Sequence, residues 1–145
     1  MLAWAVIAGM AEGGITPEMQ DFARRYTAAW CGQDPAAVAA FFSEDGSLTI
    51  NQGKPAVGRA AIEEAVSAYM KAFPDHVLFF DKLDERDGRV LFHWTFEGTN
   101  TGTGGTGNRV RFSGYEAWLM DDDGLIRDSR GTYDEADYQR QLQGA

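Results

Sequence analysis

The segment FEGTNTGTGGTGNRVRFSGYEAWLMDDDGLIRDSRGTYD, residues 96–134, decides the fold. Aromatic and β-branched residues fill the stretch from Val110 to Met120, which is typical of a strand. The polar DDDG at residues 121–124 is the kind of short turn that closes a hairpin with the strand after it. The glycine-rich TGTGGTG separates this hairpin from the strand before it. Strands joined in this way form a sheet that needs a cover on one face.

The chain before this segment supplies helices for that cover. Apolar residues recur at helical spacing in three stretches, and Thr16-Pro17 and Asp34-Pro35 are typical helix starts. The pattern predicts helices at residues 17–31, from 35 to about 42, and at 59–73, where Pro74 ends the third. A short strand at residues 47–51, strands at 76–83 and 89–97, and a helix at 135–142 complete the prediction.

Helices followed by a four-stranded antiparallel meander predict an α+β domain, in which helices cover one face of a curved, mainly antiparallel sheet. A length of 145 residues fits one domain. We assign residues 16–145 to that domain and residues 1–15 to an apolar N-terminal arm. We expect the arm to pack on its own domain or on a neighbouring subunit.

Charge and composition exclude several classes of partner. A formal net charge of −9 without any run of Lys or Arg would repel a phosphate backbone, so we expect no nucleic acid. One cysteine and two histidines supply a metal site poorly, so no metal is expected. The apolar opening is too short to span a bilayer, so no membrane contact is predicted. With a single cysteine, a reducing cytoplasm is the expected location.

Five short motifs point to a family. They are AFPD at residues 72–75, GTNTG at 98–102, TGNRVRFSG at 106–114, DGLIRDSR at 123–130 and the closing YQRQL at 138–142. In this order and spacing the chain resembles, over residues 17–142, the SnoaL-like polyketide cyclase group of the nuclear-transport-factor-2-like (NTF2-like) superfamily. The resemblance implies a cone-shaped sheet around a deep small-molecule pocket, and homodimers formed through the sheet. It also implies general acid/base chemistry without a metal or organic cofactor.

Several activities share this fold, so the fold does not fix the function. The cyclases close a ring by aldol condensation, and the superfamily also holds isomerases, dehydratases, epoxide hydrolases and binding proteins. The catalytic aspartate of the cyclases aligns with Gly131, its assisting histidine with Trp118, and the histidine of the usual GTHTG with Asn100. An epoxide hydrolase of the limonene type would need an Arg-x-Asp pair. Only the reverse order occurs, at residues 128–130.

Three side chains are candidates for the acid or base that Gly131 lacks. Glu116 shares strand parity with Trp118 and would face the same way. Asp128 lies three residues before Gly131, so it faces the pocket only if a bulge or a different register intervenes. Otherwise it is expected to be an exposed or interfacial carboxylate that pairs with Arg130 or Arg111. His93 lies mid-strand, where an imidazole could shuttle protons.

Aromatic side chains are the natural lining of a pocket between helices and sheet. Asn51, Asn100 and the Tyr69 hydroxyl could bind a ligand carbonyl. The predicted aromatic lining is Trp30, Phe42, Tyr69, Phe73, Tyr115 and Trp118. Two functions fit this set: a cofactor-independent lyase or isomerase for a hydrophobic carbonyl compound, and a non-catalytic domain that binds a hydrophobic small molecule.

Overall fold

Two of the four helices in the described part of the chain begin with the predicted side-chain caps. In the computed structural model, which describes residues 15–145, the Thr16 hydroxyl accepts a hydrogen bond from the Met19 amide at the start of α2 (Pro17–Cys31). The Asp34 carboxylate does the same for Ala37 at the start of α3 (Pro35–Ala39). Helices α4 (Arg59–Ala72) and α5 (Glu135–Leu142) lie where the sequence predicts them.

Six strands form one curved sheet in the order β2-β1-β6-β5-β4-β3. Their bounds are β1 (Phe42–Ile50), β2 (Ala56–Val57), β3 (Val77–Arg86), β4 (Arg89–Thr99), β5 (Arg109–Met120) and β6 (Ile126–Tyr133). Strands β3 to β6 form the predicted antiparallel meander. The sequence did not predict β2, or that β1 would run parallel to β6. The result is an α+β fold with a mainly antiparallel sheet.

Helix α3 ends earlier than the sequence predicts. It stops at Ala39, and Phe42 starts β1 with its side chain fully buried. The Ile126 amide donates to the Phe41 carbonyl at 2.9 Å, so strand pairing with β6 takes over where the helical pattern would have continued. Non-local pairing has outweighed local periodicity here.

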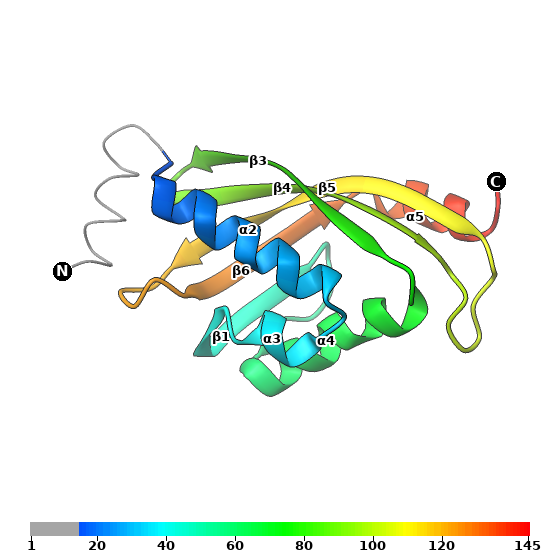
Figure 1. The fold of residues 1–145 in the computed structure, drawn as a ribbon, viewed down its shortest axis with the longest axis horizontal. Coiled ribbons are helices and arrows are strands. Elements are labelled where there is room, and N and C mark those ends of the chain that lie inside the picture. Colours follow the sequence, from blue (N-terminus) through cyan, green and yellow to red (C-terminus); the bar gives the residue numbers. More distant parts are fainter. Residues whose placement is uncertain (1–14) are drawn as a thin grey trace.

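One face of the sheet, called the inner face below, carries the helices (Figure 1). The Tyr26 ring of α2 lies 5.1 Å from the Trp118 ring and 5.4 Å from the Phe92 ring, on two central strands. Tyr69 of α4 contacts the inner face at Phe96. Tyr138 of α5 contacts it at Phe112. The opposite face, called the open face, has no helix packed against it in the described part of the chain.

The predicted N-terminal arm falls almost wholly outside the described residues. Ile15, its last residue, is partly buried against the core. Within residues 15–145, none of the helices has the length and apolar character needed to cross a membrane.

Candidate functional site

A cavity lies between the inner face and helices α2 and α4. Its enclosed volume is about 60 Å³. The cavity therefore suits a compact ligand. Its walls are Trp30, Leu48, Ile50, Tyr69, Leu78, Trp94, Phe96, Phe112, Glu116, Gly131 and Tyr133.

Glu116 is the one ionisable carboxyl in this lining, and only 7% of its surface is exposed. Three neutral side chains hold its Oε1 atom. The Tyr26 hydroxyl donates at 2.9 Å, the Trp118 indole at 2.9 Å and the Ser129 hydroxyl at 2.8 Å. Its Oε2 atom has one longer contact, with the Tyr26 hydroxyl at 3.1 Å. A carboxylate oxygen offers about two lone pairs, so Oε1 is saturated and Oε2 remains for a ligand.

Burial raises the pKa of Glu116, and the three donors offset only part of that rise. Burial and the nearby Glu116 also raise the pKa of Tyr26 well above its usual value, so its hydroxyl stays protonated and remains a donor. Glu116 thus has a greater tendency than an ordinary glutamate to carry a proton. That is the state in which a carboxyl acts as a general acid.

Gly131 lies directly beside Glu116, because the two residues are partners in the β5–β6 pairing. A Cβ atom at Gly131 would lie 3.8 Å from the Cγ atom of Glu116 and 3.7 Å from the Thr49 carbonyl, which is ordinary contact. The glycine is therefore not required by close packing. It leaves open the space that the aspartate of the cyclases would occupy.

Tyr69 and Tyr133 form a second polar pair in the lining, with their hydroxyl oxygens 3.0 Å apart. Burial is the main cause that raises the pKa of both, so both stay protonated. Two hydroxyls carry two protons and this pair uses one, so one O–H remains for a ligand.

Asp128 does not reach the cavity. Strand pairing is regular from Asp128 to Gly131, so the bulge needed to turn Asp128 inward is absent from this stretch. Its carboxylate lies on the open face, 2.6 Å from the Ser47 hydroxyl and 2.8 Å from the Arg89 guanidinium. Burial alone would raise its pKa, but Ser47 and Arg89 together lower it. Of the two partners expected from the sequence, Arg130 lies 3.3 Å from the carboxylate, whereas Arg111 pairs with Glu97 instead. The nearer partner, Arg89, was not predicted.

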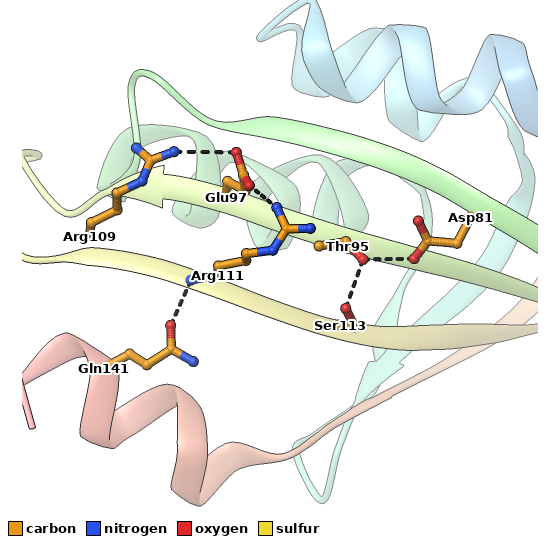
Figure 2. A network of polar contacts seen from close by, with 7 residues as sticks. All are labelled: Asp81, Thr95, Glu97, Arg109, Arg111, Ser113 and Gln141. Carbon is orange, nitrogen blue, oxygen red and sulfur yellow. Dashed lines mark hydrogen bonds and ion pairs between the residues drawn. The ribbon is translucent and has the colours of Figure 1, made fainter.

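His93 also lies on the open face, and its Nε2 atom is 3.0 Å from the Asp84 carboxylate. Tyr115 lies beside it, with the ring centres 5.7 Å apart, so this predicted lining residue faces away from the cavity as well. Figure 2 shows further polar groups on or beside this face. Thr95 contacts Asp81 and Ser113, Glu97 lies between Arg109 and Arg111, and Gln141 of α5 accepts from the Arg111 amide.

The two asparagines that were predicted to bind a ligand hydrogen-bond to other parts of the protein instead. Asn100 accepts from the Thr106 amide at 2.8 Å and donates to the Ala72 carbonyl, which fixes the glycine-rich loop against the end of α4. Asn51 accepts from the Tyr133 amide at 2.9 Å and donates to Glu135. Neither residue is part of the cavity lining.

The predicted aromatic residues divide between cavity and core. Trp30 and Tyr69 line the cavity. Trp118 lies behind the lining and reaches the site through its bond to Glu116, whereas Phe42 and Phe73 are fully buried in the core. The sequence analysis missed Tyr26, Ser129 and Tyr133. Tyr133 shares parity with Gly131, which could have indicated it, but the other two depend on how α2 and β6 meet β5.

No three His, Cys, Asp or Glu side chains cluster in residues 15–145 in a way that could hold a metal ion. The candidate site of this region is thus the cavity with its buried carboxyl and its aromatic hydroxyl and indole groups.

Comparisons with solved structures agree with the fold described above. Solved structures share the fold at low identity. A ketosteroid-isomerase-like protein from Catenulispora acidiphila, crystallised with trimethylamine, has a TM-score of 0.74 at 18% identity, covering 88% of this chain and 94% of its own. A candidate polyketide cyclase from Xanthomonas campestris has a TM-score of 0.73 at 22% identity, covering 85% and 95%. SalBIII, described as an epoxide hydrolase/cyclase-like enzyme in pyran ring formation in salinomycin, has a TM-score of 0.68 at 20% identity, covering 81% and 92%.

Sequence comparison gives the family directly. A search of curated proteins finds no significant match. The family model for SnoaL-like polyketide cyclases, however, matches residues 20–142, which is most of the chain. The protein therefore belongs to the SnoaL-like polyketide cyclase family and has its NTF2-like, ketosteroid-isomerase type of fold.

Proposed function

We propose that the cavity binds a compact hydrophobic carbonyl compound and that Glu116 exchanges a proton with it, in a cofactor-independent reaction of the lyase or isomerase kind. The observation that carries this proposal is the buried Glu116 carboxyl, which opens into an apolar cavity and has only neutral hydrogen-bond partners. Burying a carboxyl without a charged partner costs free energy of folding. Carboxyls with a perturbed pKa in clefts are typical of acid/base sites.

The proton transfer follows from the free Oε2 atom. When Glu116 is ionised, Oε2 removes a proton from the carbon next to the ligand carbonyl. The electron pair of that C–H bond forms a C=C bond with the carbonyl carbon, and the π pair of the carbonyl moves onto its oxygen. The remaining O–H of the Tyr69–Tyr133 pair stabilises the resulting enolate. Glu116, now neutral, returns the proton to another atom of the ligand, which gives an isomer, or assists the loss of a leaving group, which gives a lyase reaction.

The alternative function is binding without turnover. Gly131 and Trp118 support it, because they occupy the positions where the resemblance to the cyclases places the catalytic aspartate and its histidine. In that case the cavity would hold the same class of ligand and Glu116 would serve only as a hydrogen-bonding group.

Exchange of hydrogen for deuterium distinguishes these functions without knowledge of the natural product. Compact aromatic ketones such as 1-indanone are first tested for binding by thermal shift, and the ketones that bind are then incubated with the protein in D₂O. We expect the protein to accelerate deuterium uptake beside the carbonyl, and Glu116→Gln to reduce the acceleration by about 10²- to 10⁴-fold. Asp128→Asn is the matched control and should keep the wild-type rate. Equal rates for wild type and Glu116→Gln would refute Glu116 as the acid/base. A wild-type rate no faster than the uncatalysed exchange, with binding retained, would leave only the binding function.

We also propose that the protein forms a homodimer through the open face of the sheet, as the family resemblance implies. Support comes from the mixed surface of that face. Phe79 is exposed there beside Arg111, which pairs with Glu97, and Leu119 is exposed near the other end of β5. Figure 2 shows the ion pairs of Glu97 with Arg109 and Arg111. Light scattering should give twice the mass of 15.9 kDa for wild type. Phe79→Glu should shift the protein to monomer, and an unchanged mass would contradict this interface.

A further inference from the structure

Two buried side-chain nitrogens in residues 15–145 have no hydrogen-bond partner, namely Trp30 Nε1 and His76 Nε2. A buried N–H without an acceptor is costly and uncommon in native proteins, so each requires an explanation. His76 does not contribute to the cavity lining. Trp30 does, and 92% of its surface is buried. Its unpaired indole nitrogen therefore belongs to the candidate site.

Trp30 and Glu116 line the same cavity. The Trp30 indole lowers the pKa of the Tyr26 hydroxyl, although the two groups do not meet in hydrogen-bond geometry, so the N–H lies near that hydroxyl. The Tyr26 hydroxyl is in turn bound to both oxygens of Glu116. An unpaired donor and a carboxyl with one free oxygen are thus both close to the Tyr26 hydroxyl.

The ring of Trp30 is fixed, so the N–H cannot easily turn to another acceptor. It makes edge contacts with Tyr69 at 6.5 Å and with His76 at 6.1 Å between ring centres. Apart from Glu116 and the hydroxyls of Tyr69 and Tyr133, the rest of the cavity lining is aliphatic or aromatic, with Leu78 and Phe96 among its members. A ligand atom is then the natural acceptor for this donor.

We infer that the Trp30 indole N–H binds the acceptor oxygen of the ligand and sets it beside Glu116, which makes Trp30 a positioning and specificity-determining residue. The inference rests on the ligand cavity of the proposed function but does not depend on turnover. It narrows the ligand class to compact, largely apolar molecules that carry one uncharged acceptor oxygen, such as a ketone, next to the hydrogen that meets Oε2. A hydrocarbon of the same shape would leave the N–H unpaired and would bind less well.

A matched pair of probes tests this role. 1-Indanone and indane differ by the carbonyl oxygen, and their dissociation constants are measured for wild type and for Trp30→Phe, which removes the N–H but keeps an aromatic ring. We expect the preference for the ketone over the hydrocarbon to fall about 3- to 10-fold in Trp30→Phe. Trp94→Phe is the matched control, because Trp94 also lines the cavity but its indole nitrogen is not a buried unpaired atom. It should keep the wild-type preference.

A spectroscopic measurement on wild type decides the question even if Trp30→Phe folds poorly. The indole ¹H–¹⁵N signal of Trp30 should move downfield with 1-indanone and much less with indane. An equal preference in wild type and Trp30→Phe, or equal shifts with both probes, would overturn the inference. A retained ketone preference without deuterium exchange would instead refute the acid/base function and leave this role intact.

Discussion

Glu116 and Asp128 lie on neighbouring strands but on opposite faces of one sheet, and their acidities differ in direction. Burial pushes the pKa of both carboxyls upward. On the inner face the partners of Glu116 are a phenol, an indole and a hydroxyl, so burial prevails. On the open face the Arg89 cation joins Ser47 and reverses the effect at Asp128. The charge of the partners, more than burial alone, therefore decides that the pKa is raised at Glu116 and lowered at Asp128.

The strongest way to break this contrast is to place a second carboxyl on the inner face. Gly131→Asp does so beside Glu116 without a steric clash at Cβ. Two adjacent carboxyls in an apolar cavity cannot both ionise cheaply, so we expect the free energy of unfolding to fall by about 3 kcal/mol at pH 7. Part of that loss should return at pH 5, where the pair retains a proton. Urea unfolding at both pH values measures this, with Gly131→Asn as the neutral control of equal size. Identical behaviour of the Asp and Asn variants would contradict the apolar character that we assign to this corner.

A second test follows the proton on Glu116. The pKa of Glu116 in the folded protein is raised above the ordinary value of 4.5. Between pH 4.5 and the folded-state pKa, the folded protein therefore binds more protons than the unfolded chain. Its contribution to stability is therefore complete below pH 4.5 and declines as the pH rises through the folded pKa. The slope reaches at most about 1.4 kcal/mol per pH unit.

Glu116→Gln should lose this slope, whereas Glu64→Gln, at an exposed glutamate of α4, should retain it. Unfolding free energies between pH 4 and pH 8 provide the measurement. If the slope of Glu116→Gln matches that of wild type, Glu116 ionises as an ordinary glutamate and the contrast with Asp128 disappears.

The smallest expected effect is on the open face. Asp128→Asn removes the charge that pairs with Arg89, and we expect a loss of about 1 kcal/mol at pH 7. Because the pKa of Asp128 is lowered, its contribution is present above the unfolded pKa near 3.8 and disappears as the pH falls through the folded value. Wild type and variant should therefore converge in acid. Thermal unfolding at pH 7 and pH 3 tests this, and Asp122→Asn, in the exposed turn, should change nothing.

Much of this contrast follows from strand parity and could be predicted from the sequence. Alternation along residues 110–120 placed Glu116 on the side of Trp118, and the three-residue step from Asp128 to Gly131 placed Asp128 on the other face unless a bulge intervened. The partners that set the two pKa values could not be predicted. Tyr26 and Arg89 approach their carboxylates from elements 90 and 39 residues away in sequence, and only the packed structure sets those distances.

The fold shows the same division. Local signals such as Thr16-Pro17 located α2, and the polar turn at residues 121–124 located the last hairpin. The parallel pairing of β1 with β6 was not predicted, because no local pattern records which distant edge a strand will join. Asn100 was assigned to the ligand for a related reason. In the sequence, an asparagine that fixes a loop cannot be distinguished from one that binds a ligand.

The bond from the Tyr26 hydroxyl to Glu116 joins the first described helix to a central strand. Glu116 would therefore gain its unusual proton affinity only after α2 has docked. A chain that lacked α2 could form the same strands, yet its carboxyl would be hydrated and ordinary. The proton transfer proposed for this site would then depend on complete folding of the domain.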